Sequence, residues 1–213
     1  MMDNSKQAAH PQHQFKHDDI EVISQESVFN GFFKLIKYTF RHKLFAGGWS
    51  KPVQRELLER GHAVAVLAYD PHQDELVMVE QIRVGALTHA QPWQFELIAG
   101  MIDEGQTAID AAKRESQEEA GIELLNLHQI SKFYPSSGGC SEQIQIFVAQ
   151  VDSSQAKGIH GLAGEHEDIL VHRIKRSDAM MMLEDGRIEN AATIIGLQWL
   201  ALNHQKLIKQ WLG

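Results

Sequence analysis

The chain has 213 residues, of which 43% are hydrophobic and 23% are charged, so it is long enough for one sizeable globular domain with or without a small appendage. Its formal net charge of −8 and its isoelectric point near 5.8 exclude a broad basic surface for nucleic acid or an anionic membrane. An acidic protein still binds phosphate groups where a divalent cation bridges the two.

The sequence shows no pattern of export or membrane insertion. No run approaches the roughly 18 consecutive apolar residues of a membrane span, and the polar first 19 residues lack the apolar core of a secretory signal. The single cysteine, Cys140, excludes an intrachain disulfide and is typical of a reducing compartment. We therefore expect a soluble cytoplasmic protein.

Two different segments are expected before residue 59. Residues 1–19 are predicted to be a disordered tail, because they are rich in Gln, His and Asp and carry little apolar surface. The tail histidines His10, His13 and His17 are interpreted as solvated side chains rather than a metal site. Residues 20–58 are predicted to be a small β-rich part, in which apolar and polar residues of the segment 32–45 partly alternate with period two. Residues 53–61 fit either a strand or a short helix.

Residues 59–213 are predicted to form an α/β domain. Strands are expected at residues 63–70 and 75–84, which flank turn residues as a hairpin, and at 94–100, 124–134, 142–151 and 167–175. Near the end, one helix is expected from Ser177 or Asp178 to Gly186, and another over residues 191–212 with Asn190 as its cap. The methionine run at 180–182 is interpreted as helix packing.

The segment 100–122, GMIDEGQTAIDAAKRESQEEAGI, gathers six carboxylates against two cations. Thr107 followed by Asp110 is a capping-box signature, and Gly121 is placed to end a helix over residues 108–120. One narrow face of this helix is small or apolar and is predicted to pack closely on a sheet. That face consists of Ile109, Ala112, Ser116 and Ala120.

The carboxylates of this helix suit a divalent metal. Glu115 and Glu119 lie one turn apart beside the buried face, near the helix C-terminus where the dipole disfavours negative charge, whereas Glu118 lies further round. Arg114 is four residues from both Asp110 and Glu118 and neutralises part of the cluster. Hard oxygen ligands favour Mg²⁺, and the lack of paired His or Cys argues against zinc. A solvated acidic helix face is the alternative interpretation.

The same segment resembles the signature of the Nudix hydrolase family, G-x5-E-x7-R-E-U-x-E-E-x-G-U, in which U is a bulky apolar residue. The residues that match at the required spacing are Gly100, Arg114, Glu115, Glu118, Glu119, Gly121 and Ile122. Two positions depart from the signature, because Gln106 stands where the first Glu belongs and Ser116 occupies the apolar position. Gln106 offers an oxygen without a charge, so we expect weaker support for the metals rather than an inactive site.

From about Val22 to Leu212 the chain is similar to the bacterial ADP-ribose pyrophosphatase branch of that family, through stretches such as FNGFF (29–33), EQIR (80–83) and ENAATIIGLQWLAL (189–202). That branch typically has a proline at the position of Ser137. The resemblance implies a Nudix-type α/β/α sandwich with a mixed β-sheet, plus a small N-terminal antiparallel β subdomain. It also implies a homodimer in which the N-terminal strands pack on the partner, with the substrate pocket near the interface.

The resemblance also implies roles for residues of the signature and a requirement for Mg²⁺, with Mn²⁺ as a substitute. Glu115 and Glu119 are expected to be metal ligands, helped by the backbone carbonyl of Ala99. Glu118 is expected to be a ligand or a close neighbour of the metal. Arg114 is expected to orient the glutamates through ion pairs.

A general base is implied outside the signature. Glu165, in the Gly-containing loop GLAGEHED (161–168), matches the position that activates water in this branch, and such loops often close over a site. His166 is the rival base, and an ordinary acidic surface loop is the alternative. Cys140 has no evident His or Asp partner and is not expected to act as a nucleophile.

Substrate-binding residues are implied by the same resemblance. Arg83 resembles a phosphate-binding arginine, whose guanidinium fork suits that task, and Glu96 and Glu142 match acidic residues that line the pocket. Phe32 and Arg55 are expected to reach the partner's pocket, with the aromatic ring stacked on adenine. A core phenylalanine and a surface arginine are the alternatives for these two.

The implied activity is Mg²⁺-dependent hydrolysis of the diphosphate bond of ADP-ribose to AMP and ribose 5-phosphate, with no nucleic-acid or membrane partner. One alternative is a pyrophosphatase for another nucleoside diphosphate sugar such as GDP-mannose. Another is a Nudix-fold nucleotide-binding protein with little turnover, which only Gln106 favours. A dimeric scaffold with an incidental acidic helix is the third.

Overall fold

The computed structural model describes residues 12–213, so His10 and most of the predicted tail lie outside the described residues. The chain forms two compact units. One contains the chain up to Arg60 together with Gly138–Cys140, and the other contains Gly61–Ser137 and Ser141–Gly213. In the described part, no helix is long and apolar enough to cross a membrane.

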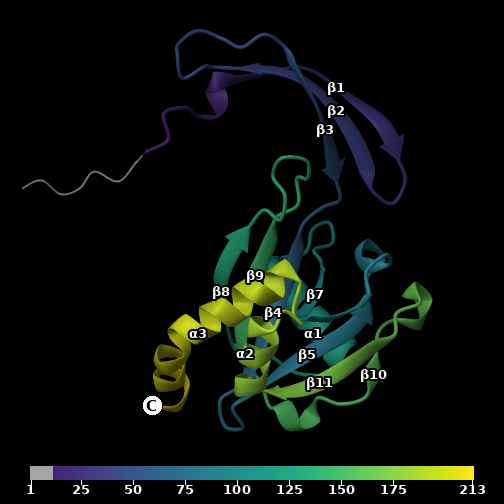
Figure 1. The fold of residues 1–213 in the computed structure, drawn as a ribbon, viewed down its shortest axis with the longest axis vertical. Coiled ribbons are helices and arrows are strands. Elements are labelled where there is room, and N and C mark those ends of the chain that lie inside the picture. Colours follow the sequence, from purple (N-terminus) through teal and green to yellow (C-terminus); the bar gives the residue numbers. More distant parts are fainter. Residues whose placement is uncertain (1–11) are drawn as a thin grey trace, which may run out of the picture. The chain divides into compact units, whose positions relative to one another are not determined.

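The smaller unit is a three-stranded antiparallel sheet in the order β1 (Ile20–Asn30), β2 (Lys34–His42) and β3 (Val53–Glu59) (Figure 1). The ambiguous residues 53–61 therefore contain a strand. A short 3₁₀ helix, His17–Asp19, precedes β1. Among the described residues of this unit only Ile36 belongs to a hydrophobic core, and β1 is exposed along its whole length.

The larger unit is built on an eight-stranded sheet in the order β10-β11-β5-β4-β9-β8, with β6 paired to β5 and β7 paired to β4. The strands are β4 (Ala63–Asp70), β5 (Glu75–Ile82), β6 (Trp93–Glu96), β7 (Ile98–Met101), β8 (Leu125–Phe133), β9 (Ile144–Gln150), β10 (Ile159–His160) and β11 (Ile169–Lys175). The β4–β9 pair is parallel and the other named pairs are antiparallel, so the sheet is mixed, as predicted.

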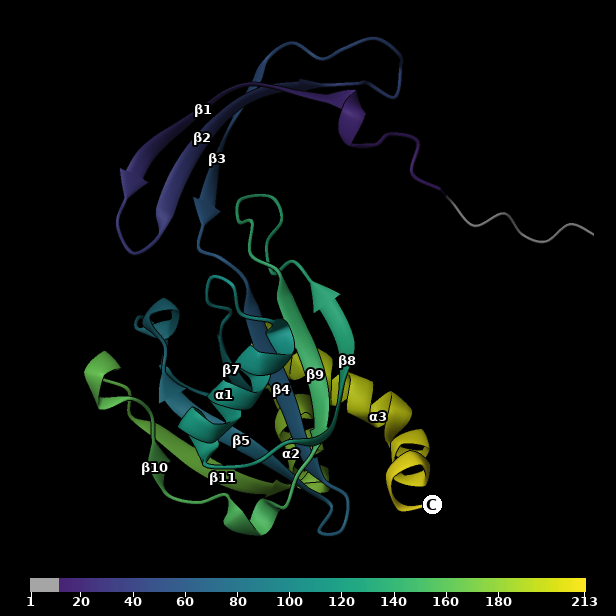
Figure 2. The same cartoon turned by 180° about the vertical axis from the view of Figure 1, so that it is seen from behind.

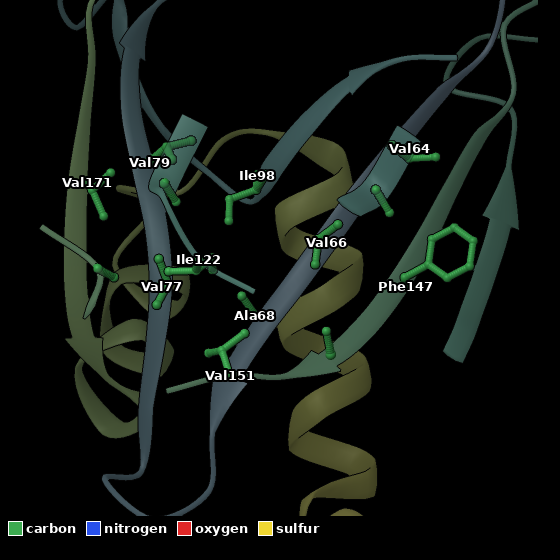
Figure 3. Close-up of a cluster of buried hydrophobic side chains, with 14 of the residues drawn as sticks. Val64, Val66, Ala68, Val77, Val79, Ile98, Ile122, Phe147, Val151 and Val171 are labelled. Atoms are coloured by element: carbon green, nitrogen blue, oxygen red, sulfur yellow. The ribbon is translucent and has the colours of Figure 1, made fainter. Parts of the chain in front are cut away.

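Helices cover both faces of this sheet. Helix α1 (Ala108–Ala120) lies on one face, and α2 (Arg176–Glu184) and α3 (Ala191–Leu212) lie on the other (Figures 1 and 2). Alternate residues of the central strands point to opposite faces. In β4, Val64 and Val66 join the cluster under α1, whereas Ala65 and Leu67 join the cluster under α2 and α3. Figure 3 shows the valines of β4, β5 and β11 on the α1 face. The predicted α/β/α sandwich is confirmed.

Helix ends agree with the expected caps because the signals are local. The Thr107 hydroxyl accepts a hydrogen bond from the Asp110 N–H at 3.2 Å, and α1 ends at Gly121 in the left-handed conformation with φ of 63°. Asn190 Oδ1 accepts from the Thr193 N–H at 3.0 Å at the start of α3. Helix α2 begins at Arg176, slightly earlier than expected.

Two expectations are wrong. The segment 94–100 is two strands, because β6 pairs with β5 and β7 pairs with β4, and between them Leu97 donates its N–H to Thr193 Oγ1 at 3.0 Å. Ile109 is 48% exposed and is not part of the buried face of α1. That face is instead completed by Ala111 and by the two glutamates Glu115 and Glu119.

Candidate functional site

Two carboxylates of α1 are buried beside the strand that precedes the helix. Glu115 is 9% exposed and Glu119 is 3% exposed. A Cβ atom at Gly100 would overlap the carboxylate of Glu115, so the strand and the glutamate approach this closely only where residue 100 has no side chain. The glycine that begins the signature is thus required by space.

Glu119 has fewer partners than its burial demands. Burial raises its pKa to about 8, and the negative charges of Glu115 and Glu167 act in the same direction. The N–H of Ala99 opposes this shift by donating to Oε2 at 3.0 Å, and Nε2 of Gln81 is 3.5 Å from Oε1. The surroundings of Glu119 therefore favour its protonated, neutral form in the absence of a bound cation.

Arg114 holds the neighbouring carboxylates in place. Its Nη2 is 2.9 Å from Glu115 Oε1, and its Nη1 donates to Glu118 Oε2 at 2.8 Å. Nη2 also donates to the carbonyl oxygen of Met101 at 3.0 Å and to Gln106 Oε1 at 3.4 Å. Burial raises the pKa of Glu115, although Arg114 acts to lower it. Because Nη1 and Nη2 both donate to protein groups, Arg114 is suited to orient the carboxylates.

Arg83 and Glu96 form an ion pair at the end of β5 and β6. Nε and Nη2 of Arg83 donate to the same oxygen of Glu96, Oε2, at 2.9 and 2.6 Å. Asn190 donates from Nδ2 to the other oxygen, Oε1, at 3.1 Å. Although burial acts to lower it, the pKa of Arg83 is raised by Glu96 and by the charges of Glu119 and Glu167. The guanidinium is therefore close enough to Glu119 of α1 for the charge of that carboxylate to raise the pKa of Arg83.

The acidic loop after β10 places its residues differently. Glu165 ends the 3₁₀ helix Ala163–Glu165 and is exposed, as is His166, which adopts a left-handed conformation with φ of 56°. Glu167 is half-buried, accepts from the Leu162 N–H at 3.1 Å, and raises the pKa of both Glu115 and Glu119 through its charge. Glu167 is not among the residues predicted from sequence, because a loop has no regular period that would indicate which of its acidic side chains faces inward.

The other predicted residues are spread over both units. Glu142 is 5% exposed and lies just before β9 in the larger unit. Phe32, at the turn between β1 and β2, is 91% exposed, and Arg55 lies in β3, so both belong to the smaller unit. Ser137 is exposed in a turn. Cys140 is half-buried and its backbone pairs with that of Leu58.

The donor set around α1 fits a hard divalent cation. Within residues 12–213 no three His, Cys, Asp or Glu side chains are gathered tightly enough to hold an ion as they stand, because the carboxylates are turned to Arg114 and to the backbone of Ala99. The nearby donors are carboxylate oxygens, which Mg²⁺ prefers. Burial of Glu115 and Glu119 leaves both with raised pKa values, so a cation would supply the positive charge that their ionised forms lack.

A separate cavity of about 350 Å³ lies on the opposite side of the sheet edge. It is lined by Glu80, Gln91, Trp93, Ile159, Asp168 and Leu170. Alternate side chains of β5 point to the same face, so Glu80 is on the face of Leu76 and Met78, which pack against α2 and α3. Gln81 points to the opposite face, where it contacts Glu119 of α1. The carboxylates of α1 therefore do not line this cavity.

Comparison with known proteins identifies the family of the chain. The chain matches the NUDIX domain family over residues 59–194. It is 49% identical over 210 residues to an ADP-ribose pyrophosphatase of Haemophilus influenzae, which covers 97% of this chain and 96% of that protein. The chain belongs to the Nudix family. It is a Nudix hydrolase, and the signature at residues 100–122 is its Nudix box.

Further relatives support the same family. The ADP-ribose pyrophosphatase of Escherichia coli strain K12 is 48% identical over 198 residues, covering 92% of this chain and 95% of that protein. A GDP-mannose pyrophosphatase of Yersinia pestis is 31% identical over 186 residues, covering 86% and 92%. A crystal structure of an ADP compounds hydrolase has a TM-score of 0.67 at 21% identity, covering 91% of this chain and 96% of that one, which shows the fold alone.

The structure explains both departures from the Nudix box. Gln106 Oε1 accepts from the Asp103 N–H at 3.3 Å and from Arg114, so it keeps one of the two acceptor oxygens of a glutamate, without the charge. Ser116 is fully buried at the apolar position, and its hydroxyl donates to the Ala112 carbonyl oxygen at 2.8 Å. Gln106 Oε1 and the Ser116 hydroxyl therefore each have a hydrogen-bond partner.

Proposed function

We propose that this Nudix hydrolase cleaves the diphosphate bond of ADP-ribose to AMP and ribose 5-phosphate in the presence of Mg²⁺. The observation that carries the proposal is the buried Glu115–Glu119 pair of an intact Nudix helix, in a chain that matches ADP-ribose pyrophosphatases over nearly its whole length. Mn²⁺ is expected to replace Mg²⁺, since both accept carboxylate oxygens.

The residues that would hold the metal follow from the donor set. Glu115 and Glu119 would be ligands, with the carbonyl of Ala99, whose N–H already donates to Glu119. Glu118 and Glu167 would be the other acidic side chains near the metal. When bound, Mg²⁺ neutralises phosphate oxygens and lowers the pKa of a coordinated water.

Other side chains act on the substrate and the water. Arg83 would bind a phosphate group of the substrate through its guanidinium, and Glu142 would line the pocket. Glu165 would accept the proton of the attacking water, carried by a loop whose Gly161 N–H is bonded to the Glu118 carbonyl oxygen at 3.3 Å. Replacing Glu165 and Glu167 one at a time by Gln separates these roles, because loss of a base lowers kcat whereas loss of a metal neighbour is relieved by more Mg²⁺.

The smaller unit supports a homodimer. A three-stranded sheet with one core residue does not bury enough apolar surface to be stable alone. Its exposed apolar side chains include Val22, Ile23, Phe29, Phe32 and Phe45. We propose that a second copy of the chain covers this sheet, and that Phe32 and Arg55 complete the partner's pocket. Light scattering of the purified protein tests this, and a monomer at micromolar concentration would contradict it.

One experiment tests the activity. The protein is incubated with ADP-ribose, GDP-mannose and other nucleoside diphosphate sugars at equal concentration with Mg²⁺, and the products are identified. Fastest cleavage of ADP-ribose, yielding AMP and ribose 5-phosphate, is expected. Faster cleavage of GDP-mannose would favour the activity named for the Yersinia relative, and binding without turnover would favour a nucleotide-binding protein. We propose a cytoplasmic location, which suits a chain with one cysteine.

A further inference from the structure

Both oxygens of the buried Glu96 carboxylate are engaged by protein groups. Glu96 is 3% exposed, Arg83 donates twice to its Oε2, and Asn190 donates to its Oε1. Three of the roughly four acceptor positions of this carboxylate are therefore used by protein donors. This arrangement suits Glu96 to hold the Arg83 guanidinium in one orientation, because a guanidinium fork bonded through two nitrogens loses most of its rotational freedom.

Asn190 has two functions that use different atoms. Its Oδ1 caps α3 by accepting from the N–H and the hydroxyl of Thr193, each at 3.0 Å, while its Nδ2 donates to Glu96. Without that donor, Oε1 of Glu96 would be a buried carboxylate oxygen with no hydrogen bond, which is unfavourable unless the side chain turns. If Glu96 turns, the anchor of Arg83 is lost.

Arg83 has a competing set of partners. The negative charges of Glu119 and Glu167 act on its guanidinium, so both lie within electrostatic reach of it. An Arg83 side chain released from Glu96 would be drawn toward the carboxylates of the Nudix helix. It would then neutralise charge that is needed for the metal and leave the position from which it meets phosphate.

We propose that Asn190 is a positioning residue for substrate binding, acting through Glu96 to hold Arg83 away from the α1 carboxylates and directed at phosphate. The inference rests on the proposed function, in which Arg83 binds a phosphate group. Asn190, the N-cap of α3, would thus act on the site through Glu96 of β6, which is 94 residues away in the sequence.

The same two elements offer a matched control. Gln94 of β6 donates to Glu189 Oε2 at 3.3 Å, next to Asn190 in the chain, whereas the Arg83 guanidinium is bonded to Glu96. Glu189→Ala removes a link between β6 and the start of α3 without touching the Glu96 carboxylate. Asn190→Ser keeps an oxygen that caps the helix but lacks the Nδ2 donor, because serine is also a favoured N-cap.

The test measures kcat, KM for ADP-ribose and the melting temperature of the full-length variants in Mg²⁺. Asn190→Ser is expected to raise KM about tenfold with kcat changed by less than about threefold, since the lost interaction serves binding. Glu189→Ala is expected to leave both constants within about twofold. In a Glu96→Gln background, Asn190→Ser is expected to add less than about twofold to KM, because the two residues act through one path.

Three results would overturn the inference: a KM of Asn190→Ser within twofold of the wild type, an equal rise in Glu189→Ala, or the full rise in the Glu96→Gln background. Binding of inorganic pyrophosphate, measured by calorimetry in EDTA, separates this from the proposed function. If the wild type does not hydrolyse ADP-ribose but Asn190→Ser still weakens pyrophosphate binding about tenfold, the proposed substrate is wrong and the positioning role stands. Unchanged pyrophosphate binding would overturn the role.

Discussion

Two groups of buried carboxylates flank the central strands of the larger sheet, and their partners differ in number. At the turn between β4 and β5, Asp70 is 3% exposed and accepts hydrogen bonds from the N–H groups of His72, Gln73 and Ser153 at 2.9 to 3.2 Å. Burial acts to raise the pKa of Asp70, but these hydrogen bonds leave it below its ordinary value. This carboxylate is stabilised in its charged form.

Glu75, which shares Ser153 as a hydrogen-bond donor with Asp70, is also stabilised in its charged form. It is 8% exposed, Arg173 donates to it twice at 2.8 and 3.0 Å, and Lys175 lies 3.0 Å from its other oxygen. Against the effect of burial, these partners and the Ser153 hydroxyl lower its pKa to about 2. Glu119, which is 3% exposed, has instead one close donor and a pKa of about 8.

Asp70 and Glu75 have the partners expected of structural charges, whereas Glu119 of α1 lacks them. A carboxylate with several donors strengthens the fold, whereas Glu119 destabilises the metal-free fold whenever it is ionised. Buried carboxylates with few hydrogen-bond donors are common at sites where a ligand provides the missing partner. The comparison therefore predicts opposite effects when the same chemical change is made at Glu119 and at Glu75.

The largest expected effect is on activity at Glu119. Glu119→Gln is expected to lower kcat for ADP-ribose roughly 10²- to 10³-fold, because the amide keeps the shape of the side chain but loses the charge that, in the proposed function, would hold the metal. Release of AMP at saturating Mg²⁺ measures it. Glu75→Gln is the matched control, and its rate per folded molecule is expected to stay within about twofold of the wild type. Activity of Glu119→Gln within fivefold of the wild type would remove Glu119 from the metal site.

The next effect is on stability at Glu75. Glu75→Gln is expected to lower the free energy of unfolding by about 3 kcal/mol at pH 7, because it leaves Arg173 and Lys175 without their buried partner. The folded pKa of about 2 lies below the ordinary 4.5, so the stabilisation is present above pH 4.5 and is lost as pH falls toward 2. Urea unfolding at pH 7 and pH 3 measures both. A loss that does not shrink at pH 3 would show that the charge is not its cause.

In the metal-free protein, ionisation of Glu119 is expected to lower the stability of the fold, whereas ionisation of Glu75 raises it. The folded pKa of Glu119, about 8, lies above the ordinary 4.5, so the stability that its protonated form contributes is present below pH 4.5 and is lost as pH rises through 8. In EDTA, Glu119→Gln and the wild type are expected to unfold alike near pH 5, and the variant to be more stable by about 1–2 kcal/mol at pH 9. A difference independent of pH would exclude ionisation of Glu119 as its source.

The smallest effect is expected at Gln106. Gln106→Glu adds a charge 3.4 Å from Arg114 Nη2, which competes with Glu115 for that guanidinium and leaves Glu115 more available to a metal. We expect the Mg²⁺ concentration for half-maximal activity to fall about two- to fivefold, the size of a partly exposed ion pair. Titration of activity at limiting Mg²⁺ measures it. An unchanged Mg²⁺ requirement would make position 106 structural only.

Sequence alone predicted the features that depend on neighbouring residues. The bounds of α1 and α3 follow from Thr107, Gly121 and Asn190, which act within one turn of the helix ends. The Nudix box likewise lies within 23 consecutive residues, so its spacing is visible without a structure. The roles of the individual site residues remain predictions.

Features that depend on distant residues were not predicted. The division of residues 94–100 into β6 and β7 arises from pairing with two different strands, and no local signal marks it. The inward position of Glu167 depends on how its loop lies against α1, and the Asn190–Glu96 hydrogen bond joins two elements far apart in the chain. Periodicity and caps contain no information about such pairings.

The hydrogen bond from the Leu58 N–H to the Gly139 carbonyl oxygen, at 2.8 Å, has a consequence for synthesis of the chain. Residue 139 follows β3 by roughly 80 residues, which a ribosome adds in about 4 to 16 s. Until then β3 lacks this partner, while β4 through β8 have already been synthesised. This hydrogen bond at the edge of the N-terminal sheet therefore forms late, although the three strands of that sheet are made first.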